Sequence, residues 1–498
     1  MRDFRILWVG QTLNELGTKV SAFAFPLLTY ALTGSITWAA IVEGAYLLGL
    51  VATLLPAGVL ADRLDRGRIM RGSAWLGAIA YAAAGTAAVL GALTLPHLLA
   101  TALVSGVAAG LLGPAETAAL RAIVPDEELP RALSLTQGRQ HVASLVGGPL
   151  GGVLYGLARS LPLLADAVSY VVSAVLLRGI RADLAAPERE HASALAELRI
   201  GVRYLAGHPL FRVLTGWAFL ANLTMNLLFH LAVLRMVGDG VAPLRIGLVE
   251  TAAAVAGIVG ALLATRVIQR VPTGWLTIGV AWSAVPLAVP MAFWPHPGVV
   301  AAALASVVLL NPAGNAGMAS YRLAVTPPEM IGRLQSATQV VALLPLPAAP
   351  VLAGVLLHTL GGRTSVLIAA AGCGLSALVP TLSRTIRAVP RPDRWLPDRS
   401  GEDAVEDLQG AGPGRGGGVD DDEVVAVDAH ELGTGAGGGG RAHVGLGLAD
   451  GHDGVLVAVD APDGHVEGHH ADRVDVVVGR AVGVSEERRD GAVTEVLR

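Results

Sequence analysis

GVLADRLDRGRIM, at residues 58–70, places five charged side chains between two long apolar stretches: Asp62, Arg63, Asp65, Arg66 and Arg68. The chain before about residue 388 divides into further apolar runs, each close to the roughly 20 residues that an α-helix needs to cross a bilayer. Charges are costly inside a bilayer but stay hydrated in a loop at its surface. The stretch therefore predicts a connection between two membrane-spanning helices.

The composition also indicates a membrane protein. Of the 498 residues, 53% are hydrophobic and only 15% are charged, whereas soluble domains carry about a quarter charged residues. The formal net charge of -4 gives no indication of nucleic-acid binding. The single cysteine, Cys373, excludes an intramolecular disulfide and a Cys-rich metal centre.

We predict twelve membrane-spanning helices. Short connections between them imply antiparallel neighbours in a tight bundle, and the first run lacks a small-residue cleavage site, so we expect a retained span. The predicted spans are 6–33, 37–60, 70–92, 95–118, 138–157, 160–178, 210–235, 244–267, 273–294, 297–322, 335–358 and 363–386.

Arginine residues gather in the even-numbered connections and at both ends of this region, and few occur in the odd-numbered connections. Cytoplasmic loops carry the excess of positive charge. Both termini are therefore expected in the cytoplasm of a multi-pass protein of the cell membrane, and residues 58–70 on its cytoplasmic side.

Two pairs of segments indicate an internal repeat. AGVLADRLDR at 57–66 aligns with ALLATRVIQR at 261–270, and VPDEELPRALS at 124–134 aligns with TPPEMIGRLQS at 326–336, both about 200 residues apart. Repeated halves are common in transporters. The predicted organisation is an N-terminal six-helix bundle at 1–178, a cytoplasmic linker at 179–208, a C-terminal six-helix bundle at 209–387 and a tail at 388–498.

The charged connection resembles that of the major facilitator superfamily, which reads G-x-L-A-D-R-x-G-R-[RK]. Gly58, Asp62, Arg63 and Arg66 match this pattern, whereas Asp65 and Gly67 replace a glycine and a basic residue. The resemblance covers about residues 4–388 and implies an all-α fold of two six-helix bundles. It also implies that Asp62 braces neighbouring helix ends in one gating state and releases them in the other. The alternative is a loop that only fixes topology.

Two other segments, 113–135 and ELGTK at 15–19, are similar to the branch of macrolide efflux proteins and the enterobactin exporter. GGPLGG at 147–152 resembles the G-P-x-x-G-G element of antiporters in the superfamily, displaced by one residue. Small residues allow close helix approach, and the proline can kink the span. Helix packing and a role in coupling both stay open for Gly147, Gly148, Pro149, Gly151 and Gly152.

Charged groups inside the spans are candidates for coupling or for lining a cavity. Glu15 and Lys19, the only lysine, lie four residues apart with the orientation that favours an ion pair; either a functional or a structural pair is consistent with this spacing. Further candidates are Glu116, Glu250, Asn222, Asn226, Asn311 and Asn315. We expect Glu43 and Asp166 to be wetted near the outer face, and His141 and His230 to be packing residues.

A nucleotide-driven pump is excluded in its P-loop form, because the only lysine stands between Thr18 and Val20 rather than in a Walker A sequence. No metal or cofactor site is predicted, and the protein is not expected to be an enzyme. The tail at 388–498 is rich in glycine and has no aromatic residue after Trp395, so we expect disorder there. Either a regulatory tail or a frame-shifted gene end fits this composition, and HVEGHH at 465–470 is a weak metal-binding candidate.

We therefore expect a monomeric secondary transporter that exports a small amphipathic drug or natural product by alternating access, driven by proton antiport. A siderophore exporter and an uptake carrier are alternatives. A membrane scaffold or sensor that transports nothing is an alternative of a different class.

Overall fold

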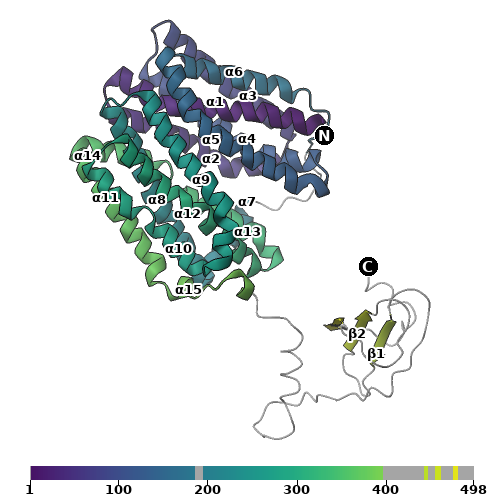
Figure 1. The fold of residues 1–498 in the computed structure, drawn as a ribbon. Helices are drawn as coiled ribbons and strands as arrows, with labels where there is room; N and C mark the ends of the chain where they lie inside the picture. The colour runs from purple at the N-terminus through teal and green to yellow at the C-terminus, as the bar shows by residue number, and fades with distance from the viewer. Residues whose placement is uncertain (1, 186–193, 396–441, 447–454, 461–474, 481–498) are drawn as a thin grey trace. The chain divides into compact units, whose positions relative to one another are not determined.

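The structure is a computed structural model that describes residues 2–185, 194–395, 442–446, 455–460 and 475–480. The chain forms two units, residues 1–408 and 409–498, which are described separately. The helical unit contains all the segments that were predicted to span the membrane (Figure 1).

Six long helices form the first half of the helical unit. They are α1 (Arg2–Thr33), α2 (Ile36–Arg63), α3 (Arg66–Val89), α4 (Leu95–Ile123), α5 (Leu129–Leu157) and α6 (Leu161–Leu177), with the 3-10 turn η1 (Asp126–Glu128) before α5. Side-chain caps begin two of them: Ser35 accepts a hydrogen bond from Trp38 N, and Asp65 accepts one from Arg68 N. The charged connection at 58–70 is thus mostly helical, and only Leu64 and Asp65 separate α2 from α3.

The second half contains helices that proline and glycine interrupt. They are α8 (Pro209–Gly238), α9 (Pro243–Arg270), α10 (Thr273–Trp282), α11 (Val285–Phe293), α12 (Pro297–Ala324), α13 (Pro328–Leu343), α14 (Ala348–Leu382) and α15 (Arg384–Arg387), followed by the 3-10 turn η2 (Pro392–Arg394). The span predicted at 273–294 corresponds to the apolar segment Thr273–Phe293, but it is divided into α10 and α11, because Pro286 lacks the N–H that would continue α10 into α11.

The last two predicted spans also begin and end differently. A turn at 344–347, which contains Pro345 and Pro347, separates α13 from α14. Gly361 then interrupts α14 with a positive φ of 74°, a backbone conformation that favours glycine. The prediction at 335–358 therefore joined parts of two helices, whereas Gly361 lies inside the short connection predicted between residues 358 and 363.

The segment predicted as a polar linker, 179–208, includes a further helix, α7 (Ala194–Gly207). It packs against α13, where Glu197 forms an ion pair with Arg333. A Cβ atom on Gly201 would lie 2.2 Å from the Arg333 carbonyl oxygen, so the two backbones touch. This part of the linker is consequently attached to the second half.

Among the described residues, eight helical segments are long and apolar enough to cross a membrane. They are Ile36–Leu54, Arg66–Val89, Leu95–Ile123, Pro209–Gly238, Pro243–Arg270, Thr273–Phe293, Pro297–Ala324 and Pro328–Leu382. Helix α6 is apolar but has only 17 residues, and α1 carries Glu15 and Lys19.

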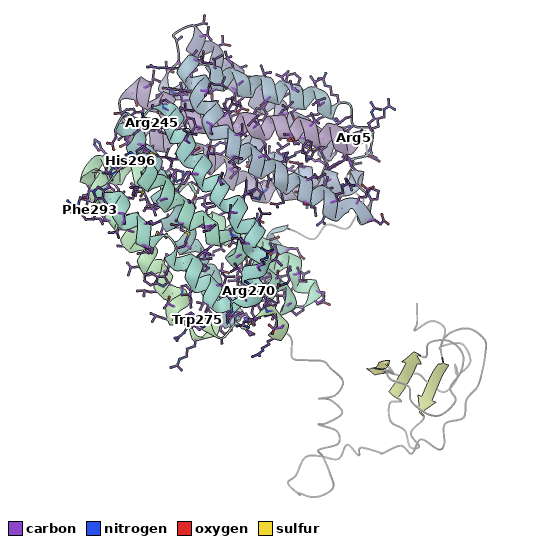
Figure 2. All side chains as sticks on the ribbon, viewed as in Figure 1. Arg5, Arg245, Arg270, Trp275, Phe293 and His296 are labelled. Carbon is purple, nitrogen blue, oxygen red and sulfur yellow. The ribbon has the colours of Figure 1, made fainter. Side chains whose placement is uncertain are left out.

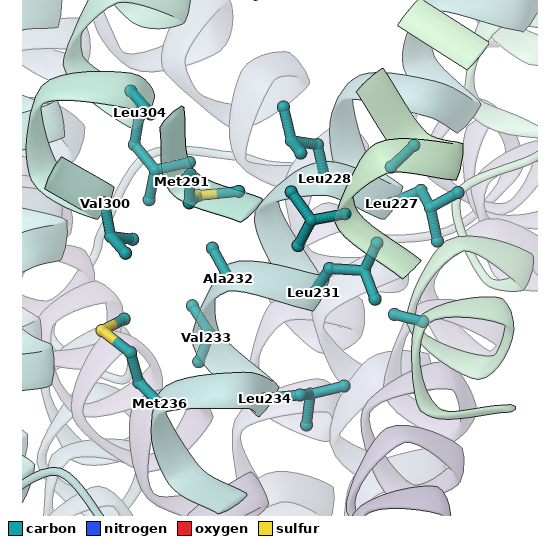
Figure 3. Close-up of a cluster of buried hydrophobic side chains, with 14 of the residues drawn as sticks. Leu227, Leu228, Leu231, Ala232, Val233, Leu234, Met236, Met291, Val300 and Leu304 are labelled. Carbon is teal, nitrogen blue, oxygen red and sulfur yellow. The ribbon is translucent and has the colours of Figure 1, made fainter. Parts of the chain in front are cut away.

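The two halves share a buried apolar cluster. It joins Phe23, Leu27 and Ala40 of the first half to residues of α8, α9, α11, α12 and α14. Figure 3 shows its centre, where Leu228 and Leu231 of α8 lie near Met291, Val300 and Leu304. This cluster lies toward the end of the helices at which Arg245, Phe293 and His296 are found, opposite Arg270 and Trp275 (Figure 2). We call this the seam end.

The second unit contains the three strands β1 (Ala442–Leu446), β2 (Val455–Asp460) and β3 (Asp475–Arg480). They form an antiparallel sheet in the order β1-β2-β3, with Val457 opposite both Val444 and Val478. For these segments the expected lack of regular structure is corrected, because runs of valine such as VLVAVD suit a pleated strand. HVEGHH lies outside the described residues, as does most of the tail.

Candidate functional site: a charged seam between two helical halves

Helices α1 and α5 run parallel and in close contact. Trp8 Nε1 donates a hydrogen bond to the Leu135 carbonyl oxygen (3.3 Å), and Tyr155 donates one to the Leu27 carbonyl oxygen (3.2 Å). Between these two bonds, a Cβ atom on Gly147 would lie 2.4 Å from Lys19 Cβ. In each pair the α5 residue follows its α1 partner by about 128 positions. Because of this register, each α1 residue on this face lies beside the α5 residue about 128 positions later in the chain.

The GGPLGG segment is enclosed by helices of both halves. Gly147 and Gly151 contact α1, at Lys19 and Phe23, whereas Gly148 and Gly152 contact α9. A Cβ atom on Gly152 would lie 2.9 Å from Leu244 Cα. Residues four apart share a helix face, so the four glycines form two smooth faces of α5, one for each neighbour.

Helix α5 therefore meets the second half backbone to backbone, and Figure 1 shows it beside α9. A Cβ atom on Gly247 would lie 2.5 Å from the Gly148 carbonyl oxygen. The Thr251 hydroxyl on α9 donates a hydrogen bond to the Leu145 carbonyl oxygen at 3.1 Å. Close contact between small residues is a common way to join membrane helices. A packing role for the segment thus has a direct geometric basis.

A second contact between the halves joins α2 to α14. A Cβ atom on Gly354 would lie 2.4 Å from Ala40 Cβ, and one on Gly44 would lie 2.7 Å from Val351 Cγ2. Gly238 at the end of α8 likewise lies against Ile36 at the start of α2. These contacts are at the seam end. Small residues therefore bring the two halves together there at two helix pairs, α5 with α9 and α2 with α14.

Four charged residues gather where the halves meet: Lys19 on α1, Glu43 on α2, His230 on α8 and Glu250 on α9. We call them the seam cluster. His230 Nε2 lies 3.0 Å from Glu43 Oε1, and the Glu250 carboxylate interacts electrostatically with the other three residues. Glu250 also lies against α5, since a Cβ atom on Gly148 would be 2.9 Å from its Oε2. The cluster thus contains groups from both halves.

The pairing of two of these residues was not predicted. His230 was expected to be a packing residue, and it is buried and hydrogen-bonded, but it also pairs with Glu43. Glu43 was expected to be wetted near the outer face, and its side chain is 25% exposed. The pair was missed because the sequence does not show which helix faces α2 across the seam.

A separate polar cluster lies within the first half, between α1, α4 and α5. Arg139 is 4% exposed and forms an ion pair with Glu116 (2.8 Å), which also interacts electrostatically with Glu15. Gln11 and Asn14 are buried beside them, and Gln11 Nε2 and Asn14 Oδ1 have no hydrogen-bond partner among the described residues. Arg139 was not predicted as a site residue. The predicted span 138–157 already contained Arg139, so a charge inside a span was the signal that was missed.

Glu15 and Lys19 do not form the expected local pair in the described part of the chain. Lys19 instead attracts Glu250 on α9, whereas the Glu15 carboxylate repels that of Glu116 on α4. Helix α1 therefore connects the polar cluster of the first half to the seam cluster, with one turn between its two charged residues.

Asp166 on α6 is a third buried charge, and it lies entirely within the first half. It has no solvent exposure, which corrects the expectation of a wetted site. Ser21 donates a hydrogen bond to its Oδ2 and Ser169 donates one to its Oδ1 (2.9 Å), and the Ser21 hydroxyl also lies 3.0 Å from the Tyr81 hydroxyl. Gly17 leaves space for the carboxyl group, because a Cβ atom there would lie 2.5 Å from Asp166 Oδ1.

Comparison with known proteins identifies the family. The model of the Major Facilitator Superfamily matches residues 7–342. The chain belongs to the Major Facilitator Superfamily. It is a multi-pass membrane transporter of a superfamily that carries small molecules across lipid bilayers and is generally not enzymatic.

A curated relative supports the same family. The uncharacterized MFS-type transporter YkuC of Bacillus subtilis (strain 168) is 26% identical over 183 residues, which are 36% of this chain and 42% of YkuC. The match thus spans less than half of the relative's length. The macrolide-efflux and enterobactin-exporter branch is not confirmed by these matches.

Solved structures share the fold. A bacterial homologue of the human lysosomal transporter Spinster, inward-facing and unoccupied, has a TM-score of 0.61 at 14% identity, covering 78% of this chain and 97% of its own. A bacterial homologue of the iron transporter ferroportin, in its inward-facing state, has a TM-score of 0.58 at 18% identity; the match covers 76% of this chain and 98% of the homologue. The outward-facing state of this homologue has a TM-score of 0.52 at 19% identity, and the match covers 77% of this chain and 99% of the homologue.

The departures from the superfamily loop pattern have local structural reasons. Asp65, which replaces a glycine, caps α3. Gly67, which replaces a basic residue, is buried and lies near Leu184. Arg66 donates hydrogen bonds to the Ala61 and Leu184 carbonyl oxygens, whereas Arg63 is exposed and Gly58 half-buried. The Asp62 side chain lies outside the described residues, so its gating role in this MFS protein stays a prediction.

The two asparagine pairs bond mainly within their own helices. Asn222 donates to the Ala218 carbonyl oxygen (2.9 Å) and Asn226 to the Asn222 carbonyl oxygen (2.7 Å), while Asn315 donates to Asn311 Oδ1. Their position along a transport cavity stays a prediction. The Asn226 carbonyl oxygen has a clear role, because it accepts a hydrogen bond from His230 Nδ1.

Proposed function

We propose that this MFS protein is a secondary active exporter of a small amphipathic compound, such as a drug or natural product. It has twelve membrane spans in two six-helix bundles, works as a monomer in the cell membrane, and has both termini in the cytoplasm. Alternating access then consists of relative movement of the two bundles around a central substrate. Proton antiport supplies the energy, because buried acids are present and a P-loop is not available in the sequence.

The observation that carries this proposal is the seam. The halves touch through glycines at the seam end, and the seam cluster places acids and cations of both halves at the same contact. A contact that contains both small-residue packing and charge can close one side of a transporter and can respond to a cation.

Transport itself tests the proposal. The protein is expressed in a pump-deficient bacterial host, and accumulation of a panel of macrolides, other amphipathic antibiotics and siderophores is measured with and without a protonophore. We expect lower accumulation of at least one amphipathic compound, reversed by the protonophore. Purified protein in proteoliposomes should then move this compound in response to an imposed pH gradient.

Two outcomes would contradict the proposal. Unchanged accumulation of every compound, with protein present in the membrane, favours the scaffold or sensor. Protonophore-sensitive uptake instead of efflux favours the uptake carrier. The matched negative control is Gly247→Leu, whose side chain would overlap the α5 backbone and prevent the seam from closing.

A further inference from the structure

The pair of Glu43 and His230 links the two halves through a contact that requires a proton. His230 Nδ1 lies 2.6 Å from the Asn226 carbonyl oxygen. A carbonyl oxygen only accepts hydrogen bonds, so Nδ1 must carry a hydrogen atom and donate it. The backbone of α8 thereby fixes which ring nitrogen is protonated when the imidazole is neutral.

The other ring nitrogen then decides the strength of the contact. Nε2 lies 3.0 Å from Glu43 Oε1. Without a proton between them, the lone pair of Nε2 would face a carboxylate oxygen, and the two would repel. With one proton, on either atom, the contact is an attractive hydrogen bond assisted by charge. A contact of 3.0 Å is therefore favourable only with one bound proton.

The surroundings of the pair make this proton consequential. The side chain of His230 is 7% exposed and that of Glu43 is 25% exposed, so the pair is weakly screened and still reachable by water. Glu250 on α9 interacts with both residues, and Lys19 on α1 interacts with Glu250. On α8, Arg235 and Asp239 pair with each other (3.7 Å). On α5, Gly147 lies against Lys19 and Gly148 lies against Glu250.

The formal charges of the seam cluster also indicate that the closed seam holds one extra proton. Lys19 offsets one of the two acids, and the second acid is offset only when the histidine–glutamate pair holds its extra proton. Loss of that proton leaves a net negative charge in a contact of low solvent exposure, which is unfavourable. Separation of the halves relieves it, because water then reaches both groups.

We propose that Glu43 and His230 form a proton-operated latch that holds the seam end closed while it binds one proton and releases it when the proton leaves. This latch rests on the proposed alternating access. The pair of Glu43 and His230 is then the group that couples alternating access to proton binding. Entry of a proton from the seam side closes that side, and loss of the proton on the opposite side permits it to reopen. This order is the one that proton antiport requires.

Distance measurements between spin labels test the latch without any substrate. Labels are attached to Leu32→Cys on α1 and Leu360→Cys on α14, two exposed positions at the seam end, in a Cys373→Ala background. For the wild-type pair, the short distance should dominate at low pH and a longer one should grow as the pH rises. One bound proton can change the ratio of the two populations by up to about tenfold per pH unit.

Glu43→Gln is the diagnostic variant. Its amide donates N–H to Nε2 permanently and so imitates the proton-bound pair, which predicts the short distance at every pH. His141→Gln removes an exposed histidine of α5 and should retain the wild-type response. Gel filtration and thermal unfolding establish that each variant is folded.

A wild-type distance distribution that does not change with pH would overturn the latch, and so would a Glu43→Gln variant that responds as the wild type does. These failures differ from a failure of the proposed export. Opening that depends on pH, in a protein that transports none of the tested compounds, would support the latch and contradict the exporter.

Discussion

The surroundings of Asp166 restrict which residues can replace it. Its carboxyl group has no solvent exposure and accepts hydrogen bonds from Ser21 and Ser169. Asp166→Asn keeps one acceptor oxygen, whereas Asp166→Leu removes both and leaves Ser21 and Ser169 only their backbone acceptors at residues 18 and 166, at about 1 kcal/mol for each lost hydrogen bond. In detergent, we expect the unfolding temperature to decrease slightly for Asp166→Asn and several times more for Asp166→Leu.

Asp393 provides the control for this comparison, because its side chain is 66% exposed. Asp393→Asn and Asp393→Leu should both leave the unfolding temperature within the scatter of the wild type. Equal losses for Asn and Leu at position 166 would show that the hydroxyl network contributes little to stability.

The individual site residues were only partly predictable from the sequence. Intramembrane charge alone identified Lys19, Glu116 and Glu250 as candidates, because an acid or a cation is costly in a bilayer. Their partners were not predictable. Arg139 pairs with Glu116 across two helices, and His230 pairs with Glu43 across the two halves. Such pairs depend on the rotation and register of packed helices, which hydrophobic runs do not define.

At the scale of elements, helix α5 offers a matched test of close packing. A Cβ atom on Gly152 would lie 2.9 Å from Leu244 Cα on α9, whereas one on Gly156, a turn later, would meet nothing within 4 Å. Gly152→Ala should therefore weaken the closed seam by roughly 1–3 kcal/mol, as overpacking typically does. In the spin-label experiment this variant should raise the long-distance population at low pH.

Gly156→Ala should leave the distance distribution unchanged, and it should slightly stabilise α5 because alanine favours a helix by about 1 kcal/mol relative to glycine. If Gly152→Ala also left the distribution unchanged, the contact between α5 and α9 would not determine seam closure.

The helices themselves were largely predictable, and the exceptions have identifiable causes. Long apolar runs located α2, α3, α4, α8, α9 and α12 to within a few residues. The breaks between α10 and α11 and between α13 and α14 were missed because apolar prolines such as Pro286 and Pro345 do not interrupt a hydrophobic run, although they interrupt helical hydrogen bonding. Helix α7 was missed because a polar linker gives a weak signal for a surface helix.

For the whole molecule, the family match supports a prediction about the tail. The superfamily model ends at residue 342, and the helical unit ends near the boundary at 408. Removal of residues 409–498 should therefore leave the proton-driven efflux per transporter unchanged within about twofold. Efflux normalised to the amount of protein in the membrane checks this.

A truncated protein that inserts normally but loses efflux would show that the tail takes part in transport. The spin-label pair provides an independent control, because its response to pH should be the same with and without the tail if the latch acts within the helical unit alone.

The glycine contacts between α5 and α9 also have a kinetic consequence. Where Gly148 meets Gly247, no side chains interlock, so the helices can part without any rotamer change or stepwise unpacking. Few groups then resist the start of the movement: the hydrogen bond from Thr251, the pair of Glu43 and His230, and the apolar residues behind them. A seam built in this way lowers the barrier to opening without weakening the closed state, and the turnover rate then depends on a small number of polar bonds.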